Sequence, residues 1–113
     1  MDSRQAVAAL GALAQATRLA VFRLLVQAGP EGMAAGAIAE ELGVLPASLS
    51  FHLQQLLHAG LILQRRESRH IFYSANYQGM NALMGYLTEN CCAGTRKGAR
   101  GASCSRAGAR AAA

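Results

Sequence analysis

All three cysteines of this 113-residue chain lie close to its C-terminal end, in the stretch "LTENCCAGTRKGARGASC". Cys91 and Cys92 are adjacent, and Cys104 follows after a spacer of eleven residues. Thiols can bind soft metal or metalloid ions, can be oxidised, or can be buried as inert apolar groups. Because these thiols adjoin a tail of Gly, Ala, Ser and Arg, inert burial is the least favoured of the three. The odd number also argues against a disulfide framework.

The length predicts one small domain whose core is limited, so a homodimer that shares apolar surface is a natural addition. The chain has no run of eighteen apolar residues, and its start, with Asp2, lacks the basic region of a secretory leader. We therefore expect a cytoplasmic protein with no membrane partner.

The net charge of +5 comes entirely from the tail. Residues 1–90 contain six basic and six acidic side chains, which cancel, and the tail adds five further basic residues. Three of the six arginines in the body are grouped at positions 65, 66 and 69. Binding of nucleic acid is therefore predicted from this local group and not from the overall charge.

Apolar residues recur at helical spacing over residues 6–28, and the break at "QATR" predicts two helices, the second capped by Thr17. "MAAGAIAEELGV" predicts a short helix that Gly43 closes. Pro46 opens a helix over 46–59 whose buried side is one leucine stripe, formed by Leu49, Leu53, Leu56 and Leu57. Two short helices joined by a tight glycine turn are the helix-turn-helix pattern.

Two β-rich runs, residues 61–64 and 71–74, flank a charged "RRESRH" tip and predict a hairpin. A last helix carries an apolar stripe that we expect in the core or in a dimer interface: Tyr77, Met80, Leu83, Met84 and Leu87. The predicted fold is mainly α with a small β-hairpin, a winged helix-turn-helix in the order α-α-α-α-β-β-α. Residues 1–92 are expected to form the winged-helix domain for DNA binding and dimerisation, and residues 93–113 a flexible basic tail that carries the third thiol.

The chain resembles the ArsR/SmtB family of metal- and metalloid-responsive repressors in four segments that occur in the family's order: "ALAQATRLAVFRLLVQAG", "GAIAEELGV", "SLSFHLQQLLHAGLI" and "RRESRHIFY". The resemblance covers roughly residues 6–90. It implies a homodimer, formed through the first and last helices, that binds double-stranded operator DNA and releases it when an inducer binds. It implies a regulator and not an enzyme.

The family's inducer sites are tested here by their residues. The Cys-x-Cys pair of many arsenic and cadmium sensors is absent from "MAAGAIAEELGV", and "NYQGMNALMGYLTEN" lacks the Asp and His ligands of zinc and nickel sensors. Only "ENCC" and the downstream cysteine remain, which resemble the arsenite sensors with a Cys-Cys pair and a third thiol. The implied inducer is As(III), with Sb(III) as the alternative, bound by Cys91, Cys92 and Cys104 without an organic cofactor. Three thiolates suit As(III), whereas zinc needs a fourth ligand.

Two groups of residues are expected to meet DNA. The N-terminal part of the recognition helix offers Ser48, Ser50, Phe51, His52 and Gln55. The wing offers Arg65, Arg66, Arg69 and His70, expected at phosphates or, for one arginine, in the minor groove. Three alternatives stay open: Phe51 contacts a thymine methyl or packs, His52 reads DNA or is structural, and the wing tip is merely solvated.

Other functions of the thiols stay open as well. A repressor of the same fold could sense thiol oxidation through a disulfide, the cysteine pair could be incidental, and a small carrier could bind arsenic without any regulatory role. A thiol-dependent reductase is disfavoured, since the sequence offers no phosphate-binding glycine loop and no base placed near Cys91.

Overall fold

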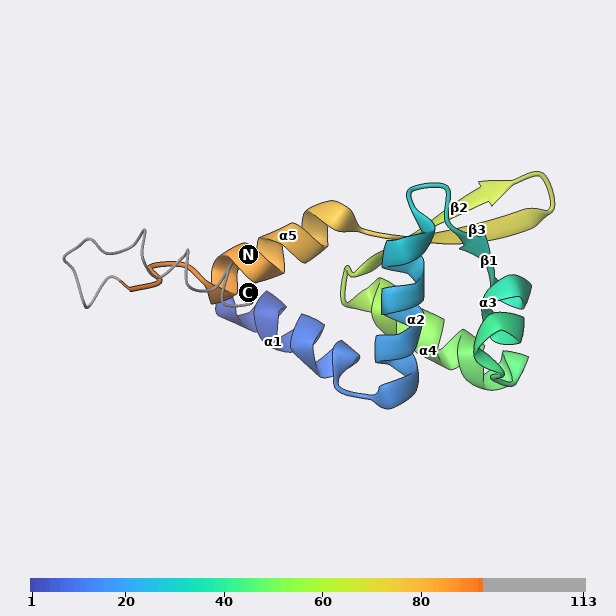
Figure 1. The fold of residues 1–113 in the computed structure, drawn as a ribbon, viewed down its shortest axis with the longest axis horizontal. Helices are drawn as coiled ribbons and strands as arrows, with labels where there is room; N and C mark the ends of the chain where they lie inside the picture. The colour runs from blue at the N-terminus through green and yellow to red at the C-terminus, as the bar shows by residue number, and fades with distance from the viewer. Residues whose placement is uncertain (93–113) are drawn as a thin grey trace, which may run out of the picture.

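The structure, a computed structural model, describes residues 1–92, and Cys104 lies outside this range. Five helices and three short strands follow one another along the chain (Figure 1): α1 (Ser3–Leu13), α2 (Ala16–Ala28), β1 (Met33–Ala34), α3 (Ala35–Leu42), α4 (Pro46–His58), β2 (Ile62–Glu67), β3 (His70–Ala75) and α5 (Tyr77–Leu87). This order confirms the predicted winged helix-turn-helix, with β1 as an additional strand.

The break between the first two helices is built from side-chain caps. Asp2 and Gln5 bond each other's backbone N–H groups at the start of α1, which is a capping box. At the start of α2 the side chain of Gln15 accepts a 2.8 Å hydrogen bond from the backbone N–H of Arg18. The prediction that Thr17 caps this helix is therefore wrong. Gln15 has the extended backbone of a cap residue, whereas Thr17 already lies inside the first turn.

The helix-turn-helix has the boundaries that Gly43 and Pro46 predict. Gly43 ends α3 with a left-handed backbone (φ +66°), which favours a residue without a Cβ. Pro46 then occupies the first turn of α4, where the missing backbone N–H costs nothing. The two helices pack against each other, and both contact α2.

The wing is longer than predicted. Strands β2 and β3 pair antiparallel from Ile62 opposite Ala75 to Glu67 opposite His70. Arg65 and Arg66 therefore lie within a strand, and only residues 68 and 69 form the tip. All residues of β2 after Ile62 are exposed to solvent, so charged residues do not end this strand there.

Strand β1 adds to the free edge of β3, which gives the sheet order β1-β3-β2. The strand follows Gly32, whose backbone has φ +77°. A Cβ at Gly32 would collide with the carbonyl oxygen of Tyr73 on β3. The close approach of β1 to β3 therefore requires glycine at this position.

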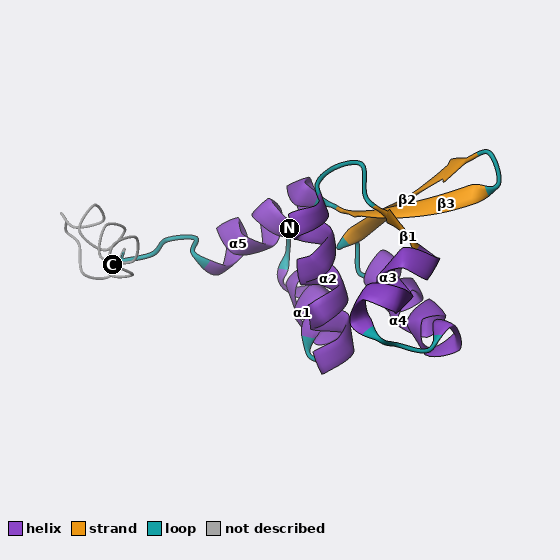
Figure 2. Ribbon diagram, turned by 45° about the vertical axis from the view of Figure 1, so that its right-hand side comes forward, coloured by secondary structure: helices purple, strands orange, loops and turns teal. Residues whose placement is uncertain are grey.

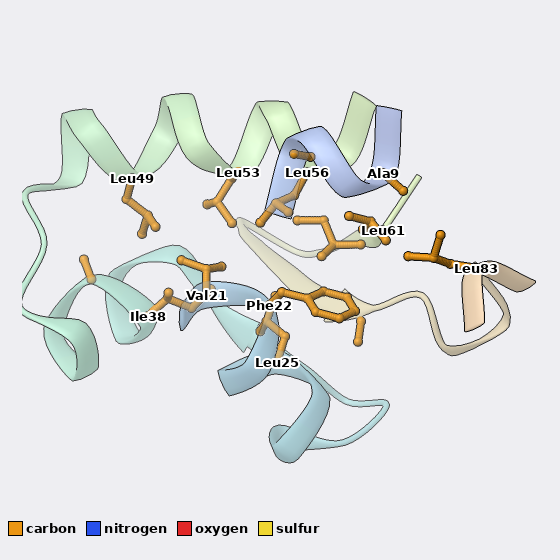
Figure 3. Close-up of a cluster of buried hydrophobic side chains, with 14 of the residues drawn as sticks. Ala9, Val21, Phe22, Leu25, Ile38, Leu49, Leu53, Leu56, Leu61 and Leu83 are labelled. Atoms are coloured by element: carbon orange, nitrogen blue, oxygen red, sulfur yellow. The ribbon is translucent and has the colours of Figure 1, made fainter. Parts of the chain in front are cut away.

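The core joins α1, α2, α3 and α4 to the base of the sheet (Figure 3). Its largest fully buried side chains are Val21, Leu25, Ile38, Leu49, Leu53, Leu56, Leu61 and Ile62. Three of the four leucines of the predicted α4 stripe are among them, whereas Leu57 is only half-buried. Burial of one such side chain stabilises the fold by about 1.5–3 kcal/mol.

Helices α1 and α5 lie side by side at the end of the molecule opposite the wing (Figures 1 and 2). Leu83 of α5 is buried against the core, while Met84 and Leu87 are exposed. Val7 and Leu10 of α1 are exposed as well. The stripe predicted for the last helix is thus divided between the core and an uncovered apolar face of α1 and α5.

Among the residues that the structure describes, no single helix is long and apolar enough to cross a membrane. Helices α1 and α2 reach the required length and composition only together, and they meet at an angle of 101°.

Candidate nucleic-acid interface and thiol site

The recognition helix α4 is oriented by its buried leucines. Since Leu49, Leu53 and Leu56 face the core, the other side of the helix faces solvent. Four of the five predicted contact residues are exposed there: Ser48, Ser50, Phe51 and Gln55. The surface expected to read DNA is therefore uncovered, and base contact by these side chains stays a prediction.

Phe51 is 58% exposed, which is unusual for an aromatic side chain. Its ring and that of His52 meet in an edge-to-face arrangement, with 5.7 Å between centroids and 62° between ring planes. The side chain is not part of the core, so its packing role is limited to this contact. A thymine methyl remains a suitable partner for the exposed ring face.

His52 is half-buried and contacts a residue from another helix. Its Nδ1 lies 3.5 Å from Nη1 of Arg18 on α2. The same guanidinium donates through Nε to the carbonyl oxygen of Ala12, at the C-terminal end of α1, over 2.7 Å. Arg18 thus connects α1 to the recognition helix. This contact favours a structural role for His52, and DNA contact by this side chain stays a prediction.

The three arginines of the wing have different surroundings. Arg65 donates to the carbonyl oxygen of Glu31 over 3.2 Å, lies 5.0 Å from the centroid of Phe72, and is 3.6 Å from a carboxylate oxygen of Glu67. These contacts hold the strand against the turn before β1. The ion pair itself is exposed and contributes little to stability.

Arg66 and Arg69 are exposed, and within residues 1–92 no hydrogen bond or ion pair holds either guanidinium. His70, also exposed, contacts Phe72 with 6.2 Å between ring centroids. The structure thus separates Arg65, which contacts other parts of the wing, from Arg66 and Arg69, whose guanidinium groups are exposed; phosphate contact by these two stays a prediction. The sequence alone did not distinguish them, because all three stand in the same "RRESR" run.

Cys91 and Cys92 follow α5 in a turn. Their sulfur atoms are 3.6 Å apart, Cys91 is exposed, and Cys92 is disulfide-bonded in the structure. The backbone of Asn90 and of Cys92 is left-handed, with φ of +61° and +66°. The turn brings the two sulfurs together, as predicted for adjacent cysteines at a helix end. Within residues 1–92 no group of three His, Cys, Asp or Glu side chains could hold a metal ion.

Two side chains that connect distant elements were not predicted from the sequence. Arg18 connects α1 with the recognition helix, and Tyr77 donates from its hydroxyl to the carbonyl oxygen of Val26 over 2.9 Å. Arg18 stands directly after the "QAT" break between two helices, which is a place where a long side chain can reach both. That position was the available signal for Arg18, whereas Tyr77 gave none beyond its apolar stripe.

A family model described as a helix-turn-helix domain matches residues 13–65. The nodulation protein NolR of Rhizobium meliloti is 33% identical over 88 residues, which cover 78% of this chain and 70% of that protein. The HTH-type transcriptional regulator YgaV of Escherichia coli K12 is 30% identical over 91 residues, covering 80% of this chain and 90% of that protein.

Solved structures agree with these relatives. The homodimeric winged helix-turn-helix domain of Mb0332 from Mycobacterium bovis, a possible ArsR-family transcriptional regulator, superposes with a TM-score of 0.63 at 30% identity, covering 77% of this chain and 81% of that one. The structure of a possible transcriptional regulator for arsenical resistance has a TM-score of 0.61 and 27% sequence identity, and the match covers 69% of this chain and 78% of that one. The structure of an ArsR-like transcriptional regulator from Rhodococcus sp. RHA1 has a TM-score of 0.73 at 23% sequence identity, and the match covers 83% of this chain and 86% of that one. At this identity the similarity shows the shared fold.

Proposed function

The chain belongs to the ArsR family of winged helix-turn-helix transcriptional regulators, and from this premise we propose that it is an arsenite-responsive repressor. In this proposal a homodimer binds operator DNA in the cytoplasm and releases it when As(III), or alternatively Sb(III), binds Cys91, Cys92 and Cys104. Cys104 lies outside the described residues and enters only as the third ligand expected from the sequence.

The observation that carries the proposal is the 3.6 Å separation between the sulfur atoms of Cys91 and Cys92. Bonds from sulfur to a thiophilic ion are about 2.3 Å long, as for zinc, so two sulfurs on one ion lie at most about 4.6 Å apart. After reduction of Cys92, both sulfurs can bind one ion with little movement. The similarity to the solved structure of a possible transcriptional regulator for arsenical resistance supports an arsenic response, independently of which residues bind the ion.

The binding reaction condenses arsenous acid with three thiols and yields a neutral tris-thiolate and three water molecules. Each thiol gives up its proton to a leaving hydroxide, so neither the net charge nor the oxidation state of arsenic changes. The signal to DNA is therefore geometric. To derepress usefully, it must weaken the DNA complex by about 2–4 kcal/mol.

The dimer is proposed to form through the uncovered apolar face of α1 and α5. Val7 is 66% exposed, Met84 56% and Leu87 54%, and Leu10 lies beside them on α1. The homodimeric state of the Mb0332 domain supports this assembly. Because the cysteines directly follow α5, closure of the tail on that helix would act on the dimer interface.

Two contacts at the other end of α5 can transmit such a movement. Tyr77 bonds the last turn of α2, and the side chain of Asn76 donates to the carbonyl oxygen of Gly60, over 2.9 Å, in the turn after α4. A shift of α5 would therefore act on the end of the recognition helix as well as on α2. We propose this as the route by which arsenic changes the spacing of the two recognition helices in the dimer.

A second candidate is a repressor of the same fold that senses thiol oxidation. The disulfide at Cys92 is the observation that favours it. Formation of a disulfide removes two electrons and two protons from two thiols, so an oxidant takes the place of arsenite as the inducer.

The deciding experiment measures operator binding by the full chain under fully reducing conditions, with and without arsenite. The wild type should lose operator affinity, and Cys91→Ser, Cys92→Ser and Cys104→Ser should each keep it in saturating arsenite. In a parallel titration without reductant, release by an added oxidant, together with no release by arsenite under reducing conditions, would establish the second candidate instead. A normal response of Cys104→Ser to arsenite would contradict the binding of arsenic by three thiols. A protein that binds arsenic but has no affinity for the operator would be a carrier and not a repressor.

A further inference from the structure

A hollow of about 250 Å³ opens between α1, α2 and α4 and has no role in the function proposed above. Its wall includes Ala8, Gly11 and Ala12 of α1, Arg18 of α2, and Gln55 and His58 of α4. The hollow exists because α1 presents only small side chains there. A Cβ added at Gly11 would meet nothing within 4 Å.

The charge in this hollow is positive. Arg18 uses one of its five N–H groups on Ala12 and one on His52, which leaves three. Within residues 1–92 no carboxylate forms an ion pair with Arg18, and the first turn of α2 contains no acidic residue. A half-buried guanidinium in such surroundings favours an anion as its partner.

We propose that this hollow is an effector site for a small organic carboxylate. The carboxylate would pair with Arg18, and the apolar part of the ligand would lie against Ala8, Gly11 and Ala12. A cavity of about 150 Å³ accommodates a benzene molecule, so the hollow has room for a ring-sized apolar group together with its carboxylate. None of these residues belongs to the apolar face of α1 and α5 or to the cysteine turn, so arsenic and the carboxylate occupy separate sites.

The ligand would act on the recognition helix through Arg18. The contact between Arg18 and His52 is long, at 3.5 Å, whereas a carboxylate can bind a guanidinium with two short parallel hydrogen bonds. The ligand therefore draws the guanidinium away from His52, which frees this side chain of α4. The site couples a small acid to the surface that reads DNA.

The test uses the full-length protein under reducing conditions, titrated with sodium benzoate or sodium hexanoate and followed by NMR. Benzoate should bind with a Kd on the order of 1 mM, as expected for a ligand of about nine non-hydrogen atoms. The backbone signals of Gly11 and Ala12 and the imidazole signals of His52 and His58 should move together. The chain has three histidines, and His70 on the wing should not move, which gives an internal control. Benzamide, which has the same ring without the charge, should bind at least about tenfold more weakly.

Variants separate the charge from the shape of the site. Arg18→Gln should weaken benzoate binding at least about tenfold. Gly11→Leu should abolish it by filling the hollow, with Ala8→Leu as a second variant, while Gly36→Leu on α3, where an added Cβ also meets nothing, should bind normally. The proposal is overturned by equal binding of benzamide, by no saturable binding of either acid, or by wild-type affinity in the filled variants. Movement of His58 without His52 would contradict the coupling to α4.

Discussion

The hydroxyl of Tyr77, the first residue of α5, donates a 2.9 Å hydrogen bond to the carbonyl oxygen of Val26 in the last turn of α2. This carbonyl belongs to the helix end that has no partner within its own helix. A few residues further on, the carbonyl oxygen of Glu31 accepts a hydrogen bond from the guanidinium of Arg65 in the wing. One short segment, the end of α2 and its following turn, therefore connects α5, the helix that precedes the cysteines, with the wing.

Tyr77→Phe removes this hydrogen bond and a longer one, of 3.4 Å, from the same hydroxyl to the carbonyl oxygen of Leu25. We expect the free energy of unfolding to fall by about 0.5–1.5 kcal/mol, the usual contribution of one such bond. Because α5 loses its tie to α2, arsenite should also release operator DNA less completely. Chemical denaturation and operator titration in arsenite measure the two effects.

The matched control is Tyr86→Phe in the same helix. Tyr86 is half-buried, and within residues 1–92 its hydroxyl makes no hydrogen bond, so this change should leave both the stability and the response close to wild type. An equal loss of response in the two variants would show that the Tyr77 hydroxyl does not transmit the signal.

Arg66 and Arg69, the two arginines of the wing with no partner within the described residues, are expected to bind phosphates. Arg66→Ala and Arg69→Ala should each lower operator affinity, and the slope of log K against log salt should become shallower by about 0.9 for each lost contact. Unfolding should be unaffected, since neither guanidinium has a partner within the described residues. Fluorescence anisotropy at several salt concentrations measures the slope.

Arg65→Gln should affect the stability of the wing more than the salt dependence of operator binding. It removes the hydrogen bond to Glu31 and the stacking on Phe72, so the wing should become less protected against amide exchange. The salt slope should change less than in the other two variants. Identical slopes for all three variants would mean that the internal contacts of Arg65 do not keep it from DNA.

Much of this fold was predictable from local signals in the sequence. The leucine stripe, Gly43 and Pro46 fixed the helix-turn-helix, because each acts over one or two turns of chain. The strand β1 was missed, since two residues give no alternation and depend on a contact with Tyr73, which is far away in sequence. The cap at Gln15 was missed because Thr17 is the stronger cap former by residue type.

The site was predictable to a lesser degree. Residue type and helical spacing placed Ser48, Ser50 and Gln55 on the exposed side of α4, and adjacency placed the two sulfurs together. The roles of Arg18 and Arg65 depend on which carbonyl groups their long side chains reach. Such contacts between distant segments leave no periodic pattern in the sequence.

Gly32 and Gly36 offer a matched pair of substitutions. Gly32→Ala should destabilise the fold by more than about 1 kcal/mol, since alanine disfavours φ of +77° and its Cβ would collide with the carbonyl oxygen of Tyr73. Gly36→Ala lies inside a helix with open space around it, and it should stabilise the protein by about 0.5–1 kcal/mol. Thermal and chemical unfolding measure both. Equal effects of the two changes would contradict the close approach of β1 to β3.

The proposed dimer interface can be tested by introducing one charged side chain into it. Leu10 on α1 and Leu19 on α2 are equally exposed, at 43% and 44%, but only Leu10 belongs to the apolar face shared with α5. Leu10→Glu would bury one carboxylate from each copy in the interface, and a buried unpaired ion costs several kcal/mol. We therefore expect Leu10→Glu to sediment as a monomer and to lose operator affinity, and Leu19→Glu to remain a dimer. A dimeric Leu10→Glu protein in analytical ultracentrifugation would place the interface elsewhere, and the route from the cysteines to DNA would then not pass between α1 and α5.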